Sequence, residues 1–189
     1  IMLSLFAAVA GVAASGEFTV ELENSVDVPP QSVQGVEVDQ IAVVKPGNPI
    51  EGQTSGPIGE IYAVAFAEPD GDNELIDIFP DGGSNRISIS SDDRIAGTHV
   101  VAVASGPSRD DIEDAQPVVI EAYSVSVSSS DGFETTTQSE LNVSASLSEQ
   151  DSVNSSINDI EAVVWNDTHT DRISMDQRDD LEYHMAISD

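Results

Sequence analysis

Short runs in which apolar and polar residues alternate one by one make up most of the chain from Phe18 onward. In Phe18-Thr-Val-Glu-Leu-Glu23, for example, every second side chain is apolar. A period of two indicates a β-strand with one buried face, because successive side chains of a strand point to opposite sides of a sheet. Turns rich in Gly, Pro, Asp and Asn separate the runs, and no long amphipathic helix is apparent. The sequence therefore predicts an all-β fold.

The number and kind of these runs predict one antiparallel β-sandwich, and they fit a single jelly roll better than a seven-stranded immunoglobulin-like fold. The runs at 58–67 and 98–104 are apolar on both faces, which is typical of central strands. Half-buried strands are expected at 75–79, 86–90, 123–127, 141–147, 160–165 and 181–187. Short helices could form only at 105–116 and 168–180. After Gln40 the apolar phase of its strand slips by one residue, which predicts a β-bulge.

The first 15 residues contain no charged side chain, so the sequence divides into an apolar N-terminal arm or anchor, residues 1–17, and one β-sandwich domain, residues 18–189. As a helix, the uncharged segment would be about 22 Å long, shorter than the hydrocarbon core of a bilayer. It is expected to touch a membrane, to pack against neighbouring subunits, or to be the remnant of a signal peptide. The residues expected to make the assembly or membrane contact are Met2, Leu3, Leu5, Phe6, Val9 and Val12.

Acidic residues outnumber basic ones: 35 Asp and Glu stand against 6 Lys and Arg, which gives a net charge of -29. Such a chain repels the phosphate backbone, so we expect no nucleic-acid partner. A surface this acidic, with Lys45 as the single Lys, is typical of proteins that work in molar salt, where the screening length shrinks to about 3 Å. Hydrophobic residues still make up 39% of the chain, enough for a folded core.

No residue is expected to be catalytic, and the chain is predicted not to be an enzyme. In so acidic a chain, pairs of carboxylates occur at every useful spacing by chance, so they do not single out a general acid and base. The sequence has no G-x-S-x-G motif for a nucleophilic Ser, and the absence of Cys removes thiolate catalysis and Cys-ligated metal sites.

Two segments have residue spacings that could bind a cation. Asp70 and Asp72 occupy the first and third positions of a calcium loop, but a Leu replaces the Gly at the sixth. Asp167, His169 and Asp171 alternate along an extended segment, so their side chains would share one face. Either segment would hold Ca²⁺ or another cation, whereas a hairpin turn and a solvated loop are the competing explanations. No other cofactor is expected.

Three N-x-S/T sequons make Asn142, Asn154 and Asn166 candidates for N-glycosylation, and all three are expected to face solvent. A chain rich in Ser and Thr also contains such triplets by chance. Glycosylation would imply that the protein is exported.

An acidic surface, one β-sandwich, an apolar arm and no credible active site together indicate a building block. In this general character, spread over the whole chain and without a diagnostic motif, the sequence resembles the small major capsid protein of haloarchaeal icosahedral viruses with an internal membrane. The resemblance implies an upright single jelly roll that self-assembles in the shell of a virion. It also implies a second related capsid subunit as a partner and contact between the arm and the viral membrane.

A subunit of a haloarchaeal surface filament is the alternative. There the arm would pack in the filament core or add a strand to the next subunit, and glycans would cover the extracellular surface. A third interpretation, a secreted binding module or sandwich enzyme that acts on carbohydrates, would need an aromatic platform, and Trp165 is the only Trp. Exposure of Trp165 beside Asp167 and His169 would favour that interpretation.

Overall fold

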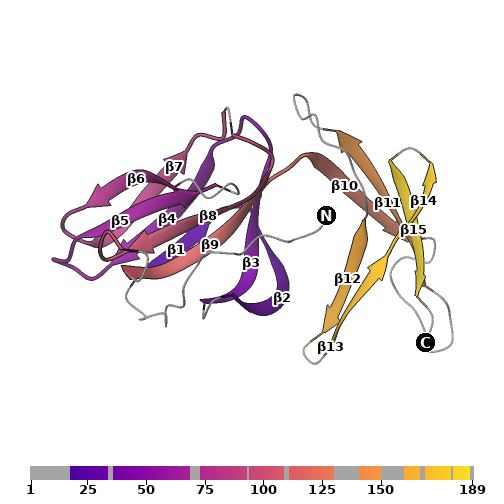
Figure 1. Cartoon of the computed structure of the whole chain (residues 1–189), viewed down its shortest axis with the longest axis horizontal. Helices are drawn as coiled ribbons and strands as arrows, with labels where there is room; N and C mark the ends of the chain where they lie inside the picture. The colour runs from indigo at the N-terminus through magenta and orange to yellow at the C-terminus, as the bar shows by residue number, and fades with distance from the viewer. Residues whose placement is uncertain are drawn as a thin grey trace. The chain divides into compact units, whose positions relative to one another are not determined.

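The computed structural model describes residues 18–33, 36–68, 73–92, 94–108, 111–129, 141–149, 160–166, 169–179 and 181–187. Within these ranges the secondary structure is almost entirely β and includes no α-helix, which confirms the prediction of an all-β fold (Figure 1). The chain divides into two compact units that meet in the sequence between Glu121 and Ala122. We call the described residues up to Glu121 the N-terminal unit and those from Ala122 the C-terminal unit.

The N-terminal unit is a sandwich of two sheets. One sheet has three strands in the order β1-β4-β7, and the other has six in the order β2-β3-β9-β8-β5-β6. The strands are β1 Thr19–Leu22, β2 Ser25–Val33, β3 Val36–Val44, β4 Ile50–Gly56, β5 Tyr62–Ala67, β6 Asn73–Phe79, β7 Gly83–Ile89, β8 Gly97–Ala104 and β9 Ile112–Ile120. All paired strands of this unit are antiparallel except β3 and β9, which run parallel. This parallel pair departs from the purely antiparallel arrangement that the sequence predicts.

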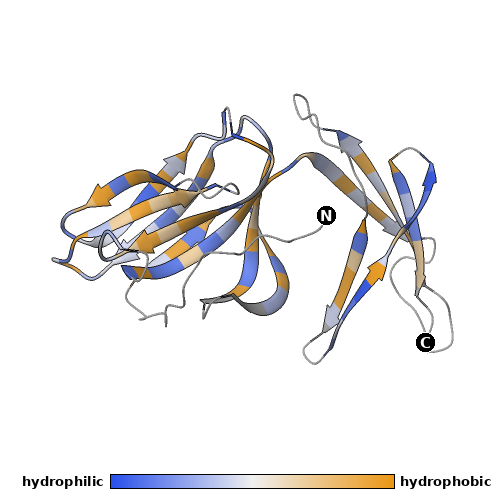
Figure 2. Ribbon diagram, viewed as in Figure 1, coloured by the Kyte–Doolittle hydropathy of each residue, from blue (hydrophilic) through white to orange (hydrophobic). Residues whose placement is uncertain are grey.

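The apolar faces of the two sheets meet in one core. From the three-stranded sheet and the residue before it come Phe18, Val20, Leu22, Ile50, Ile87 and Ile89; from the six-stranded sheet come Ala42, Val44, Tyr62, Val64, Phe66, Val101, Val103 and Val118. The alternation that buries them is visible along the strands in Figure 2. It confirms the half-buried strand expected after Phe18, the central strand expected at 98–104 and, from Tyr62 onward, the central strand expected at 58–67.

The expected phase slip after Gln40 is wrong. β3 buries Ala42 and Val44, which continue the phase of Val38 along the strand. The irregular register lies instead in the partner strand β2, which contains two consecutive prolines. Because proline has no N–H to donate, the ladder is interrupted there and the bulge falls on β2.

Other local expectations also need correction. The first part of the run at 58–67 forms a turn, and Ile58 is 93% exposed. The segments considered for short helices supply β9 and two strands of the C-terminal unit. In β9 the residues from Gln116 to Val118 are buried, and the strand pairs with β8 along one edge and with β3 along the other.

The C-terminal unit contains a four-stranded antiparallel sheet, in the order β10-β11-β15-β14, and the hairpin β12-β13. Its strands are β10 Tyr123–Ser129, β11 Leu141–Glu149, β12 Glu161–Asn166, β13 His169–Ser174, β14 Asp176–Asp179 and β15 Glu182–Ile187. One face of the four-stranded sheet buries Val143, Ala145, Leu147, Tyr183 and Met185. The alternation expected at 141–147 and 181–187 is confirmed by this burial.

The division into two units differs from the single domain expected over residues 18–189. Strand β9 ends at Ile120 and β10 begins at Tyr123, so only Glu121 and Ala122 join the units. Neither a Gly, nor a Pro, nor a polar run marks this junction, and the sequence therefore gives no local sign of it.

Candidate functional site

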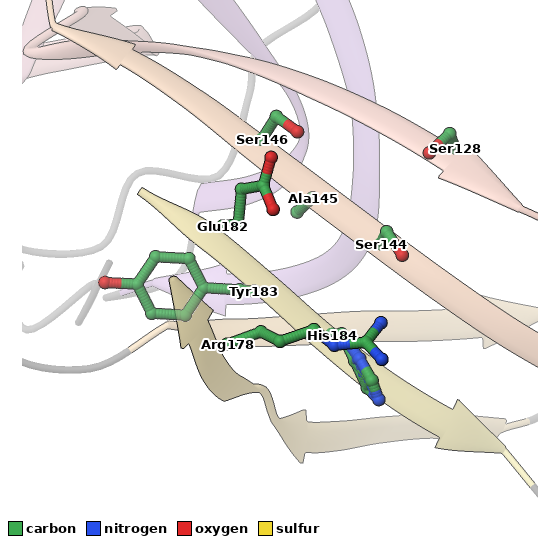
Figure 3. Close-up of a pocket in the computed structure, with 8 residues that line it drawn as sticks. All are labelled: Ser128, Ser144, Ala145, Ser146, Arg178, Glu182, Tyr183 and His184. Atoms are coloured by element: carbon green, nitrogen blue, oxygen red, sulfur yellow. The ribbon is translucent and has the colours of Figure 1, made fainter. Parts of the chain in front are cut away.

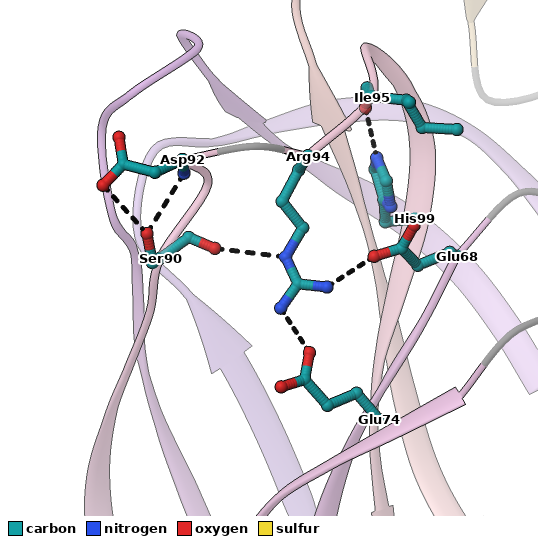
Figure 4. A network of polar contacts seen from close by, with 7 residues as sticks. All are labelled: Glu68, Glu74, Ser90, Asp92, Arg94, Ile95 and His99. Atoms are coloured by element: carbon teal, nitrogen blue, oxygen red, sulfur yellow. Dashed lines mark hydrogen bonds and ion pairs between the residues drawn. The ribbon is translucent and has the colours of Figure 1, made fainter.

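The most elaborate polar contact in the N-terminal unit is made by Arg94, in the connection between β7 and β8. Its guanidinium donates hydrogen bonds to the carboxylates of Glu68 and Glu74, each at 2.5 Å, and to the carbonyl of Ser90 at 3.2 Å (Figure 4). The same group lies over the ring of Phe66, 4.3 Å from its centre. Arg94 thus ties the β7–β8 connection to residues on both sides of the β5–β6 connection.

The stack continues from Phe66 into the sheet. The imidazole of His99, which is buried, stacks on the Phe66 ring at 5.0 Å, and its Nε2 is 2.8 Å from the carbonyl oxygen of Ile95. Burial alone would lower the pKa of Arg94, but the hydrogen bonds and charges of the two glutamates outweigh it and raise the pKa above its ordinary value. The guanidinium therefore stays charged and serves as a structural clamp.

Arg94→Ala is expected to lower the free energy of unfolding by about 2 kcal/mol, because it leaves the partly buried Glu68 without its partner and removes the contact with Phe66. The pair with Glu74 adds little, since that carboxylate is more than half exposed. Urea unfolding in molar KCl measures the change. Arg86→Ala, at an exposed position of β7, is the matched control and should shift stability by about 0.5 kcal/mol or less. Equal losses in both variants would show that Arg94 is not a clamp.

Strand β1 forms backbone hydrogen bonds to side chains of β9. The N–H of Val20 donates to Oδ2 of Asp114 at 2.8 Å, and the N–H of Leu22 donates to Oε1 of Gln116 at 2.7 Å. The amide of Gln116 in turn donates to the hydroxyl of Ser25. Because β4 pairs with β1 along its other edge, both edges of this short strand are bonded.

Burial raises the pKa of Asp114, although hydrogen bonds from the N–H groups of Val20 and Ala115 oppose the shift. A carboxyl whose pKa is higher in the folded state than in the unfolded state binds more protons when folded. Its contribution to stability is therefore present at low pH and is lost as the pH rises through the folded-state pKa.

Asp114→Asn should remove this pH dependence. We expect the stability of the original chain relative to the Asn variant to fall as the pH rises above about 4, where Asp ionises in the unfolded chain. Asp114→Ala should cost about 1–3 kcal/mol below about pH 4, because it leaves the Val20 N–H unpaired, and the cost should fall as the pH rises. Urea unfolding at several pH values measures both effects, with Asp39→Asn at an exposed position as the control for lost charge. A pH-independent difference for Asp114→Asn would contradict the assignment.

A polar pocket of about 240 Å³ lies on the C-terminal unit (Figure 3). Strands β10, β11, β14 and β15 line it with Ser128, Ser144, Ala145, Ser146, Arg178, Glu182, Tyr183 and His184. Cross-strand pairing sets Ser144 opposite His184 and Ser146 opposite Glu182. Its polar lining combines Ser hydroxyls with the guanidinium of Arg178, the carboxylate of Glu182 and the imidazole of His184. The alternation of Ser along β10 and β11 predicts this face, but nothing in the sequence brings Arg178 to it.

The cation candidates are brought together only in part. Nε2 of His169 lies 3.0 Å from Oδ2 of Asp171, as expected for alternate residues of a strand, and both side chains are exposed. Asp167 lies outside the described residues, as do Asp70 and Asp72. Across the described ranges, no three His, Asp or Glu side chains cluster in a way that could hold a metal ion. Glu74, at the fifth position of the calcium-loop pattern, is already paired with Arg94.

The expected solvent exposure can be checked for one of the three sequon asparagines and for Trp165. Asn142 is exposed on β11, as expected, whereas Asn154 and the side chain of Asn166 lie outside what the structure describes. Trp165 is 45% exposed and pairs across the hairpin with Thr170. Since Asn166 pairs with His169, the register sets Trp165 and His169 on opposite faces of the hairpin. The aromatic side chain and the imidazole therefore do not form one platform.

The residues expected to make assembly or membrane contacts, Met2, Leu3, Leu5, Phe6, Val9 and Val12, also lie outside the described residues. In the part of the chain that the structure describes, no helix has the length and apolar character needed to cross a membrane. No protein-family model matches the sequence, and neither does any curated protein.

Proposed function

We propose that this chain is a structural, self-assembling protein, namely a major capsid protein in the icosahedral shell of a halophilic archaeal virus. The observation that carries the proposal is the fastening of β1. This strand follows the uncharged segment closely in the sequence, with Phe18 already buried in the core. Hydrogen bonds hold both edges of β1, to β4 on one side and to side chains of β9 on the other. A force that pulls on the arm is therefore transmitted to both sheets of the sandwich and does not detach β1 alone. An arm that joins subunits or touches a membrane needs such an attachment.

The charge of the chain supports the halophilic part of the proposal. A net charge of -29 on 189 residues would keep copies apart in dilute buffer, whereas molar salt screens the repulsion and permits close packing. In this proposal the sandwich of the N-terminal unit takes the place of the single jelly roll expected from the sequence. The partners are further copies of the chain, a second related capsid subunit, and the viral membrane at the arm.

Sedimentation velocity in molar KCl tests the proposal. The full chain should form large particles, and a variant without residues 1–15 should remain small while keeping the same thermal unfolding midpoint. Leu5→Asp combined with Phe6→Asp keeps the chain length and should match the truncation. A full chain that stays monomeric at every concentration in molar salt would overturn the proposal.

A surface filament remains the second candidate, because Asn142 of a sequon is exposed on β11. A glycan there would coat the outer surface of such a filament. Electron microscopy of the particles distinguishes closed shells from helical filaments.

A further inference from the structure

The six-stranded sheet of the N-terminal unit is apolar on both faces along β5 and β8. One set of alternate side chains lies in the core between the two sheets. The set on the opposite face is made of small apolar residues in both strands. These are Ala63, Ala65 and Ala67 of β5 and, directly across from them, Ala104, Ala102 and Val100 of β8. We call these six residues, together with Leu75 and Ile78 of β6, the outer face.

Strand β6 continues the outer face to the edge of the sheet. Leu75 pairs with Ala65 and Ile78 pairs with Ala63, so both side chains lie on the same side of the sheet as the alanines. They are 58% and 51% exposed, whereas the two other apolar side chains of β6 pack against the core. Large apolar side chains are therefore exposed beside a strip of small ones.

The outer face has no charge, although the chain as a whole is strongly acidic. No charged residue lies between Glu60 and Glu68, which flank β5, or between Arg94 and Arg109, which flank β8. An uncharged apolar sheet face of this kind is typical of a surface that another layer covers. Its eight residues include no Trp, Tyr, Lys or Arg, the residues that anchor proteins at a lipid surface, which favours a protein segment over a membrane.

The N-terminal segment has the composition that such a surface requires. Its first 15 residues carry no charge, whereas every other segment outside the described ranges, apart from residues 34 and 35, contains at least one charged residue. The segment leads into Phe18, whose ring contacts that of Tyr62 at the start of β5, with 6.3 Å between the ring centres. Fully extended, 15 residues span about 50 Å, roughly twice the length of an eight-residue strand. The segment is therefore long enough to reach beyond its own sandwich.

We infer that the outer face binds the uncharged N-terminal segment of a second copy of the chain. The inference rests on the proposed function and names the surface that the arm of one subunit contacts on the next. Bulky side chains of the segment, such as Leu5 and Phe6, would pack against alanines that leave room for a close approach. Because the segment and the face are different surfaces, the contact passes from copy to copy and builds assemblies larger than a dimer.

A photoreactive group in the segment tests where it binds. The full chain with p-benzoylphenylalanine in place of Phe6 is refolded from urea into molar KCl as a mixture of isotope-labelled and unlabelled copies, and is then irradiated. Mass spectrometry should find the cross-links on peptides that contain β5, β6 or β8. Links between labelled and unlabelled peptides should be as frequent as links within one isotope, because the copies meet at random.

The same photoreactive group in place of Trp165 is the matched control. Trp165 is an exposed aromatic residue of the C-terminal unit. We expect about tenfold fewer links to β5, β6 and β8 from this position, because only a bound segment holds its reactive group at a raised local concentration.

A charge placed on the outer face tests the surface itself. Ala65→Glu should lower the sedimentation coefficient in molar KCl to that of a single chain, as removal of residues 1–15 does in the proposed function. Ser88→Glu adds the same charge at an exposed position of β7 and should assemble like the original chain. Thermal unfolding midpoints of both variants should match the original chain, because both new carboxylates can reach solvent.

Links confined to one isotope would place the segment on its own copy and overturn the inference, as would links to the three-stranded sheet or to other N-terminal segments. If Ala65→Glu assembles like the original chain, the outer face is not the contact and the proposed function stands. Assembly only after lipid vesicles are added would assign the segment to a membrane instead. If the original chain does not assemble at all, the inference and the proposed function both fail.

Discussion

Transfer from molar KCl to about 0.1 M is expected to unfold much of the protein. The screening length grows from about 3 Å to about 10 Å over this change, so carboxylates on neighbouring strands begin to repel one another. With 35 acidic residues against 6 basic ones, few of these charges have a partner of opposite sign. We expect the loss to amount to several kcal/mol, roughly the whole margin of 5–15 kcal/mol that keeps an ordinary domain folded. Circular dichroism during a salt titration measures it.

A charge-reduced variant separates repulsion from other effects of salt. Amide replacements at five exposed carboxylates, Glu21, Asp39, Glu51, Glu60 and Glu149, change the net charge from -29 to -24, since -29 + 5 = -24. The salt midpoint of unfolding should move to a lower concentration in this variant. A midpoint that does not move would mean that salt acts on the apolar core instead.

Gly82→Ala is expected to cost about 3 kcal/mol or more, from steric clash added to backbone strain. Gly82 has a φ of +62°, and a Cβ at this position would lie 1.8 Å from the carbonyl oxygen of Pro57. That oxygen accepts a hydrogen bond from the N–H of Glu60, and Gly59 N–H donates to the carbonyl of Asp81. The β4–β5 and β6–β7 connections are therefore held together at the place where the methyl group would enter.

Gly83→Ala is the control for this substitution. Gly83 also has a positive φ, +73°, but no atom lies within 4 Å of its added Cβ. At this position only the strain of a positive φ should lower the free energy of unfolding, by about 1 kcal/mol. Urea unfolding of the two variants in molar KCl gives the steric part as their difference, and equal losses would contradict the close contact at Pro57.

The sequence predicts strands well where alternation and burial agree. Phe18, Val20 and Leu22 all lie in the core, as their spacing indicates. The prediction is poorer for β10, where Val125 and Val127 alternate just as regularly and yet are half exposed. Alternation identifies the apolar face of a strand, but it does not reveal whether another layer covers that face.

Contacts between distant segments were beyond prediction from the sequence. Arg94 meets Glu68 and Glu74, which lie 26 and 20 residues away, and Val20 meets Asp114 across 94 residues. In a chain with 35 acidic residues, no local signal selects these three carboxylates from the rest. The parallel pairing of β3 with β9 could not be predicted either, because the two strands are far apart in the sequence and no local pattern indicates that they lie side by side.

Electron microscopy of the native material in molar salt, with the mass of the chain determined from the same sample, tests the proposed function most directly. The account predicts closed icosahedral shells in which this chain is a major component. Helical filaments, above all with mass added at the sequons, would contradict the capsid proposal in favour of the filament, and a soluble monomer would contradict both.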